Sequence, residues 1–120
     1  MHKEINIEER KPIWIALSNF YLDTELQDLD FKHIALKIKE SPYSLEEVKK
    51  INKKEVFPVL YINLLSVAGV WSGFQEEWLV DEITKKNQKR TRFRHNLDRL
   101  NYFFFKGMNK GYWKKLEKHM

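Results

Sequence analysis

The sequence contains no cysteine, and only four of its 120 residues are glycine. Without cysteine the chain has no disulfide framework, no cysteine-based zinc site and no thiol nucleophile. The glycines stand at positions 69, 73, 107 and 111, a spacing that matches neither a dinucleotide fingerprint nor a phosphate-binding loop. These absences exclude the kinds of site that depend on such signatures.

Signatures of metal binding and of hydrolysis are also missing. The four histidines, at positions 2, 33, 95 and 119, do not cluster, and none belongs to a His-Glu-x-x-His arrangement. The acidic stretch from Asp23 to Asp30 lacks the glycine and the terminal glutamate of a calcium-binding loop, so helix capping explains it better. No serine sits in a nucleophile elbow. We therefore predict no metal, no cofactor and no enzymatic activity.

No apolar run is clean enough to predict a membrane span. The longest uncharged stretch, Val56–Phe74, has 19 residues, but Pro58, Asn63 and several serines and glycines interrupt it. It predicts a buried core helix followed by a tight loop. The N-terminal residues MHKEINIEERK are charged and lack the hydrophobic stretch of a signal peptide, which together with the absence of cysteine favours the cytoplasm.

The sequence does have ample material for a core. Hydrophobic residues make up 42% of it and aromatic residues 14%, and its length is typical of one domain. Apolar residues recur every three or four positions, and no strand-type alternation of useful length appears. We expect a single all-α domain over residues 1–120, a compact bundle of six to seven short helices.

Local signals place several helix ends. Pro12 suits a first helical turn, which needs no donor from its nitrogen, so the first helix should cover about residues 10–22. Ser44 and Glu47 form a capping-box pattern at the start of another helix. Pro58 is expected near the start of the apolar helix, since proline is tolerated there.

Periodicity also predicts which side chains enter the core. In the segment after residue 73, Phe74, Trp78, Leu79 and Ile83 should point inward while the neighbouring carboxylates point outward. A final short helix should carry Tyr112, Trp113 and Leu116. A longer helix before it should use a stripe with spacings of four, three and four, formed by Phe93, Leu97, Leu100 and Phe104.

The net charge of +5 conceals an uneven distribution. Residues 1–83 carry 10 lysines and arginines against 15 acidic residues, a balance of −5. Residues 84–120 carry 12 against 2, a balance of +10, and are rich in aromatic residues. Such a split favours a surface for a polyanion or an acidic partner, although a solvated basic helix has the same pattern.

Two functional hypotheses depend on the basic part. Cations between Lys85 and Arg99, followed by aromatic residues at 102–105, are the ingredients of phosphate neutralisation and base stacking, as in a nucleic-acid-binding protein. The Arg-x-x-x-x-His spacing of Arg90 and His95 also resembles that of small helical ribonucleases of toxin systems. That resemblance implies a histidine acting as acid or base and an arginine holding phosphate, although Thr91 departs from the pattern.

Most of the chain resembles a known family. The phrases run from Arg10 to Ile83: ERKPIWIALSNFYLDTEL, YSLEEVKKI, EVFPVL and NLLSVAGVWSGFQEEWL. They are similar to those of a family of small stand-alone bacterial proteins catalogued as a domain of unknown function. The resemblance implies no activity and no catalytic residue. Small bacterial proteins of this kind are often immunity proteins or adaptor modules, which is an analogy only.

The leading hypothesis is a protein-binding module without catalytic activity, and its most specific form is an immunity protein that neutralises a cognate bacterial toxin. We expect one protein partner, no membrane, and a monomer or small homo-oligomer. Trp71, between two glycines, could anchor a partner or fill the core beneath its loop. The predicted partner-binding residues are Trp71, Lys85, Lys86, Lys89, Arg90, Arg92 and Arg94.

Overall fold

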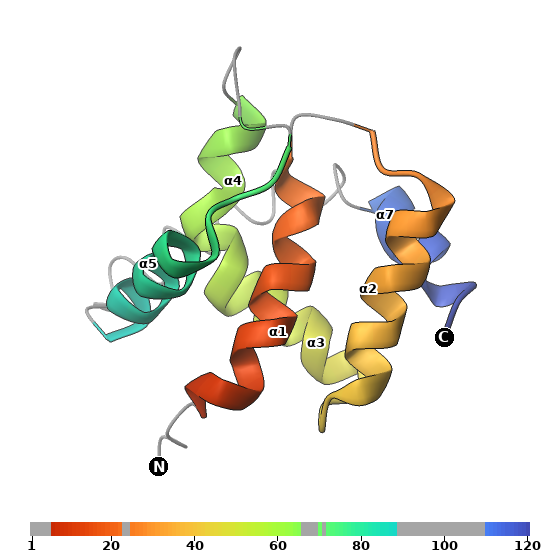
Figure 1. Ribbon diagram of the computed structural model, residues 1–120, viewed down its shortest axis with the longest axis horizontal. Helices are drawn as coiled ribbons and strands as arrows, with labels where there is room; N and C mark the ends of the chain where they lie inside the picture. Colours follow the sequence, from red (N-terminus) through yellow and green to blue (C-terminus); the bar gives the residue numbers. More distant parts are fainter. Residues whose placement is uncertain (1–5, 23–24, 66–69, 71, 89–109) are drawn as a thin grey trace.

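The computed structural model describes residues 6–22, 25–65, 70, 72–88 and 110–120 and confirms the predicted all-α bundle (Figure 1). No strand occurs among these residues. The elements in chain order are α1 (Ile7–Ser18), the 3-10 turn η1 (Asn19–Tyr21), α2 (Asp28–Glu40), α3 (Leu45–Ile51), the π-helical turn η2 (Asn52–Val56), α4 (Phe57–Leu65), α5 (Glu76–Gln88) and α7 (Lys110–Glu117).

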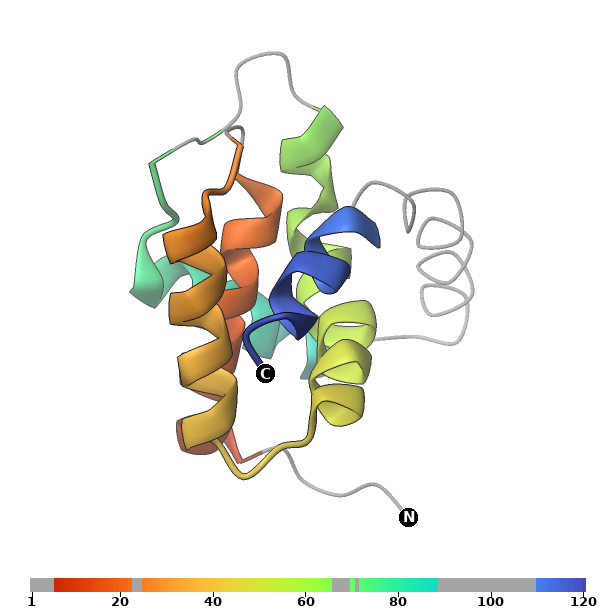
Figure 2. The same ribbon diagram turned by 90° about the vertical axis from the view of Figure 1, so that its right-hand side faces the viewer.

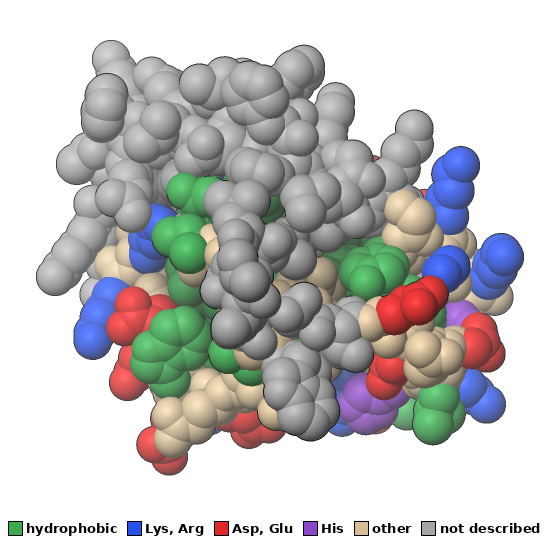
Figure 3. All heavy atoms as spheres, turned by 90° about the horizontal axis from the view of Figure 1, so that it is seen from above, with side chains coloured by type: hydrophobic (Ala, Val, Ile, Leu, Met, Phe, Trp, Pro, Cys, Tyr) green, Lys and Arg blue, Asp and Glu red, His purple; other side chains and the backbone are tan. Residues whose placement is uncertain are grey.

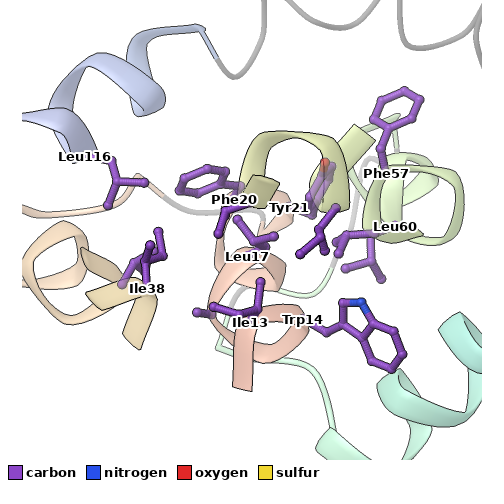
Figure 4. Close-up of a cluster of buried hydrophobic side chains, with 14 of the residues drawn as sticks. Ile13, Trp14, Leu17, Phe20, Tyr21, Ile38, Phe57, Leu60 and Leu116 are labelled. Atoms are coloured by element: carbon purple, nitrogen blue, oxygen red, sulfur yellow. The ribbon is translucent and has the colours of Figure 1, made fainter. Parts of the chain in front are cut away.

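Helix α1 lies at the centre of the described fold. It contacts α2, α5 and η2. The turn η1 extends α1 at its C-terminal end and contacts α4. Its core side chains leave the helix in several directions, which explains why helices surround it (Figure 4). Those with almost no exposed surface are Ile13, Trp14 and Leu17 of α1, together with Phe20 and Tyr21 of η1.

Helix α1 begins earlier than Pro12 predicted. Its first residue is Ile7, and the Asn6 side chain caps it by accepting a hydrogen bond of 3.2 Å from the Glu9 N–H. Pro12 therefore lies in the interior of the helix and is exposed. The cap satisfies a free backbone donor, and Glu8 and Glu9 interact favourably with the positive end of the helix dipole, so both stabilise the additional turn.

Helices α3 and α4 form one continuous rod through η2, and Pro58 is the second residue of α4, near its start as predicted. The Phe57 N–H donates to the Asn52 carbonyl five residues earlier, which is the hydrogen bond of a π turn. Pro58 has no N–H to continue the α-helical pattern. The wide turn directly before it allows the chain to remain helical through the proline.

The capping box predicted at Ser44 is confirmed. The Ser44 hydroxyl accepts from the Glu47 N–H at 3.1 Å, and the Glu47 carboxylate accepts from the Ser44 N–H at 3.0 Å. Both bonds satisfy donors that the first turn of α3 leaves without a helical partner. Among the described helix starts, α2 has a comparable box between Gln27 and Asp30.

Ser44→Ala is expected to lower the free energy of unfolding by about 1 kcal/mol, because the Glu47 N–H loses its acceptor. The shift should appear as a lower urea midpoint with an unchanged slope in a circular dichroism titration. Ser44→Asp restores an acceptor and should recover most of the loss. Equal midpoints for the alanine variant and the wild type would show that water replaces the cap.

Helix α7 covers the space between α2 and the rod formed by α3 and α4 (Figure 2). Its Leu116 is fully buried, and Trp113 meets Phe20 edge-on with ring centroids 5.0 Å apart. Tyr112 contacts the rings of Phe20 and Phe31 at 5.4 and 5.5 Å. The predicted final helix is thus confirmed, and it closes one side of the core.

Asn63 ties the end of α4 to η1 and to the segment that follows. Its amide nitrogen donates to the carbonyls of Tyr21, at 2.6 Å, and Val70, at 3.1 Å. Its oxygen accepts from the Val70 N–H at 2.9 Å. One side chain therefore bridges two separate stretches of backbone. Within the described part of the chain, no helix is long and apolar enough to cross a membrane.

Candidate functional site

A partly buried ion pair joins α1 to the π turn. The Arg10 guanidinium binds one carboxylate oxygen of Glu55, and the Trp14 indole N–H donates to the other at 2.8 Å. The Glu55 residue is 8% exposed. Arg10 and Trp14 are four residues apart on α1, so one helical face presents both donors to the same carboxylate. Glu55 points at them because η2 turns it toward α1.

Tyr43 completes this cluster from the loop before α3. The Arg10 Nε–H donates to the Tyr43 hydroxyl at 3.1 Å, and the guanidinium lies 5.1 Å from the centre of the same ring. Burial alone would lower the pKa of Arg10, but hydrogen bonds and Coulombic attraction from Glu55 and then Tyr43 outweigh it and raise the pKa. The guanidinium is therefore charged at every pH at which the fold exists.

A second buried polar contact lies one turn earlier on the rod. The Tyr21 hydroxyl donates to the Asn52 side-chain oxygen at 2.6 Å. Asn52 is fully buried, and its Nδ2 has no hydrogen-bond partner in the described part of the chain. Because η2 holds both Asn52 and Glu55, two polar contacts fix this unusual turn against α1 and η1.

The polar cluster of Arg10, Trp14, Tyr43 and Glu55 joins α1 to the loop before α3 and to η2, and we call it the Arg10–Glu55 joint. Both carboxylate oxygens of Glu55 accept strong donors, and little of the residue reaches solvent, so its remaining lone pairs are poorly accessible to a substrate. The four members also come from three of the sequence phrases that carry the family resemblance. Arg10 and Trp14 belong to the first, Tyr43 to the second and Glu55 to the third.

The predicted partner-binding residues are only partly described. Lys85 and Lys86 lie on α5, where Lys85 is exposed and the Lys86 ammonium donates to the Pro58 carbonyl. Lys86 thus fixes α5 to α4, which gives it a packing role. The other members lie outside the described residues, as do His95 and the stripe from Phe93 to Phe104. These are Trp71, Lys89, Arg90, Arg92 and Arg94.

Trp78 does not point into the core as predicted. It is 44% exposed, whereas Leu79 and Ile83 are fully buried. Its ring stacks on Phe74, with centroids 6.2 Å apart and planes 18° from parallel. A residue next to Leu79 is rotated by about 100° around the helix, and this places Trp78 on the flank of α5.

Carboxylates surround this aromatic pair. Asp81 and Glu82 follow Trp78 by three and four residues and are therefore its neighbours on the helix surface. We call Phe74, Trp78, Asp81 and Glu82 the acidic–aromatic face. In Figure 3, hydrophobic, acidic and basic side chains lie together at the left edge, on the side where Figure 1 places α5. The signal in the sequence was that Trp78 shares its stripe with charged residues.

In the described part of the chain, charged residues of the acidic and the basic parts of the sequence contact each other. Lys49 of α3 forms an ion pair of 3.1 Å with Glu117 of α7, and its ammonium lies 5.9 Å from the Trp113 ring. Lys49, which belongs to the part with a balance of −5, therefore lies beside the C-terminal helix. Among the described residues, no three metal-ligating side chains gather at one point.

Comparison with known proteins adds the family. No curated protein and no solved structure matches this chain. One family model matches residues 8–119, which extends the resemblance beyond Ile83 and through the basic part. The Arg10–Glu55 joint, the acidic–aromatic face and α7 all lie within the matched range. The chain therefore belongs to the family described as Domain of unknown function (DUF7079).

Proposed function

We propose that this protein is a protein-binding module and that the acidic–aromatic face of α5 contacts its partner. The observation that carries the proposal is the exposure of Trp78 beside a stacked Phe74. Tryptophan is among the residues that most often dominate the binding energy of an interface. A folded chain gains nothing in stability from leaving so large an apolar ring half in water.

The stacked ring makes this surface ready for binding. Phe74 holds the Trp78 indole in one orientation, so less side-chain freedom is lost when a partner covers it. Asp81 and Glu82 give the rim a negative potential, which attracts a basic surface and accelerates the encounter. The preferred partner therefore carries a cationic rim around an apolar pocket.

The most specific form of the proposal is an immunity protein that occludes a cognate bacterial toxin. Toxins that act on nucleic acid tend to be basic, and an acidic face with an aromatic anchor is complementary to them. Binding through the basic part of the chain instead would favour nucleic acid, and the experiment below distinguishes the two outcomes.

Trp78→Ala is expected to weaken partner binding by at least about 2 kcal/mol, or roughly thirtyfold in Kd, because it removes the anchor of the face. The tagged full chain is first used to isolate a stoichiometric protein from an extract of its native host. The Kd of that purified protein is then measured by calorimetry for the wild type and the variant.

Ile62→Ala is the matched control, since Ile62 is also a large exposed apolar residue but lies on α4. It should leave the Kd within about twofold of the wild type. Asp81→Lys should mainly slow association and reduce its salt dependence. Equal Kd values for the Trp78 variant and the wild type, or recovery of nucleic acid in place of a protein, would contradict the proposal.

A further inference from the structure

Helix α2 presents two exposed leucines on one stripe. Leu29 is 75% exposed and Leu36 is 52% exposed. They are seven residues apart, which is about two turns, so they lie above one another on the same side. The opposite side of α2 enters the core through Phe31 and Ile38. Figures 1 and 2 show α2 at the periphery of the described fold.

The charges beside this stripe have opposite signs at the two ends of α2. Asp28 and Asp30 occupy its first turn, and Lys37 and Lys39 occupy its last. At 100° per residue, Asp30 and Lys37 lie about 100° and 80° from Leu29 on one flank. Asp28 and Lys39 lie at about the same angles on the other flank. Among these four residues each flank has one acid and one base. Lys32 lies on the flank of Asp28 and Lys39, and Glu40, which is 3.8 Å from Lys37, lies beside the leucine stripe.

This pattern is complementary to itself in an antiparallel arrangement. A two-fold axis that relates two antiparallel helices brings each flank against the same flank of its copy. Positions 30 and 37, and positions 28 and 39, are symmetric about the same point between His33 and Ile34. In that single register every aspartate meets a lysine, and four ion pairs enclose the four leucines.

We propose that the outer face of α2 binds a second copy of this chain in antiparallel orientation and so forms a homodimer. The contacts that Asp28 and Asp30 make within one copy leave each carboxylate able to bind a lysine of the other copy. Asp30 accepts from the Gln27 N–H at 2.8 Å and Asp28 contacts His119 at 2.8 Å, each through one carboxylate oxygen. The second oxygen of each carboxylate remains for the lysine of the copy.

The dimer is a weak one. One short helix from each copy buries less than the roughly 1,200 Å² of a standard interface, and exposed ion pairs add little to affinity. Lys32 of one chain also lies near Lys32 of the other, and their like charges oppose association. The leucines therefore supply the affinity, while the ion pairs fix the antiparallel direction. Since α1 lies between α2 and α5, both acidic–aromatic faces stay accessible, and this inference does not depend on the proposed function.

Sedimentation equilibrium of the full chain tests the proposal. Between about 5 and 500 µM the average mass should rise from 14.6 kDa toward twice that value. Leu36→Asp should stay monomeric at every concentration with unchanged helicity. Ile62→Asp changes an equally exposed residue on α4 and should associate like the wild type. A wild type that stays monomeric, or a Leu36→Asp variant that still associates, overturns the proposal.

Charge exchange tests the antiparallel register. A chain with Lys37→Glu and Lys39→Glu has an acidic α2, and a chain with Asp28→Lys and Asp30→Lys has a basic one. Each should be monomeric alone, and an equal mixture should form dimers. Two chains that fold but do not associate when mixed would overturn the register. If the basic chain fails to fold, dimerisation of the acidic chain at wild-type strength would overturn it.

Discussion

Glu55→Ala is expected to lower the free energy of unfolding by about 3–5 kcal/mol, because it leaves the partly buried Arg10 charge without its counter-ion. The same change removes the acceptor of the Trp14 indole N–H, which is buried and has no access to water. Domains of this size are stable by only about 5–15 kcal/mol, so the variant should unfold at a much lower urea concentration. Trp14 fluorescence and circular dichroism should report this together.

Two further variants separate the contributions to this loss. Glu55→Gln keeps an oxygen for one donor but removes the charge, and we expect it to cost about 1–3 kcal/mol. Glu46→Ala removes a carboxylate of the same rod that is mostly exposed and lies 3.8 Å from Lys49, and it should change stability by less than about 0.5 kcal/mol. If Glu55→Ala were no more harmful than Glu46→Ala, the joint would not stabilise the fold.

Phe20→Ala should destabilise the protein by about 3–5 kcal/mol, because it opens a cavity at the point where α7 meets η1. The Phe20 ring is 1% exposed and contacts both Tyr112 and Trp113. Its loss also removes two aromatic contacts that orient α7. Hydrogen exchange under native conditions should show α7 amides losing more protection than those of α2.

Phe20→Leu serves as the comparison for the cavity. It retains most of the apolar volume and should cost about 1.5 kcal/mol or less, yet it removes both ring contacts. Greater exchange in α7 with this variant would show that the rings themselves hold the helix. Uniform loss of protection across all helices in the alanine variant would instead show that α7 opens only with the whole domain.

Short-range patterns in the sequence predicted much of the fold. The capping box at Ser44 depends on residues three positions apart, and the buried stripe of α2 depends on a spacing of three and four. Both are satisfied within a single helix, so tertiary structure did not need to be known. The all-α class and the final helix around Leu116 follow from the same local periodicity.

The joint between Arg10 and Glu55 could not be predicted in this way. Its partners are 45 residues apart, and nothing at either position reveals which of many carboxylates an arginine will meet. Pro12 was misplaced for a related reason, since an Asn6 cap can begin a helix upstream of the proline. The exposure of Trp78 depended on which of two adjacent apolar residues faces α1, and only packing decides that.

The π turn of η2 has a consequence for the angular phase of the rod. Counting 100° per residue from the buried Val48, an unbroken α-helix would place Ile62 about 40° from it and Phe57 on the opposite side. The observed burial is the reverse, with Ile62 61% exposed and Phe57 and Leu60 buried.

A π turn advances by only about 82° per residue, so the five residues of η2 delay the helix by about a quarter turn. That delay brings Leu60 to about 30° from Val48 and turns Phe57 from the opposite side to about 90° from it. Deleting one residue between 52 and 56 would let four α-helical steps of about 100° replace five π-helical steps of about 82°, so the upper half of the rod would keep its phase to within about 10°. If the same five residues became α-helical without a deletion, the upper half would rotate by about a quarter turn, and its apolar side chains would leave the core around α1.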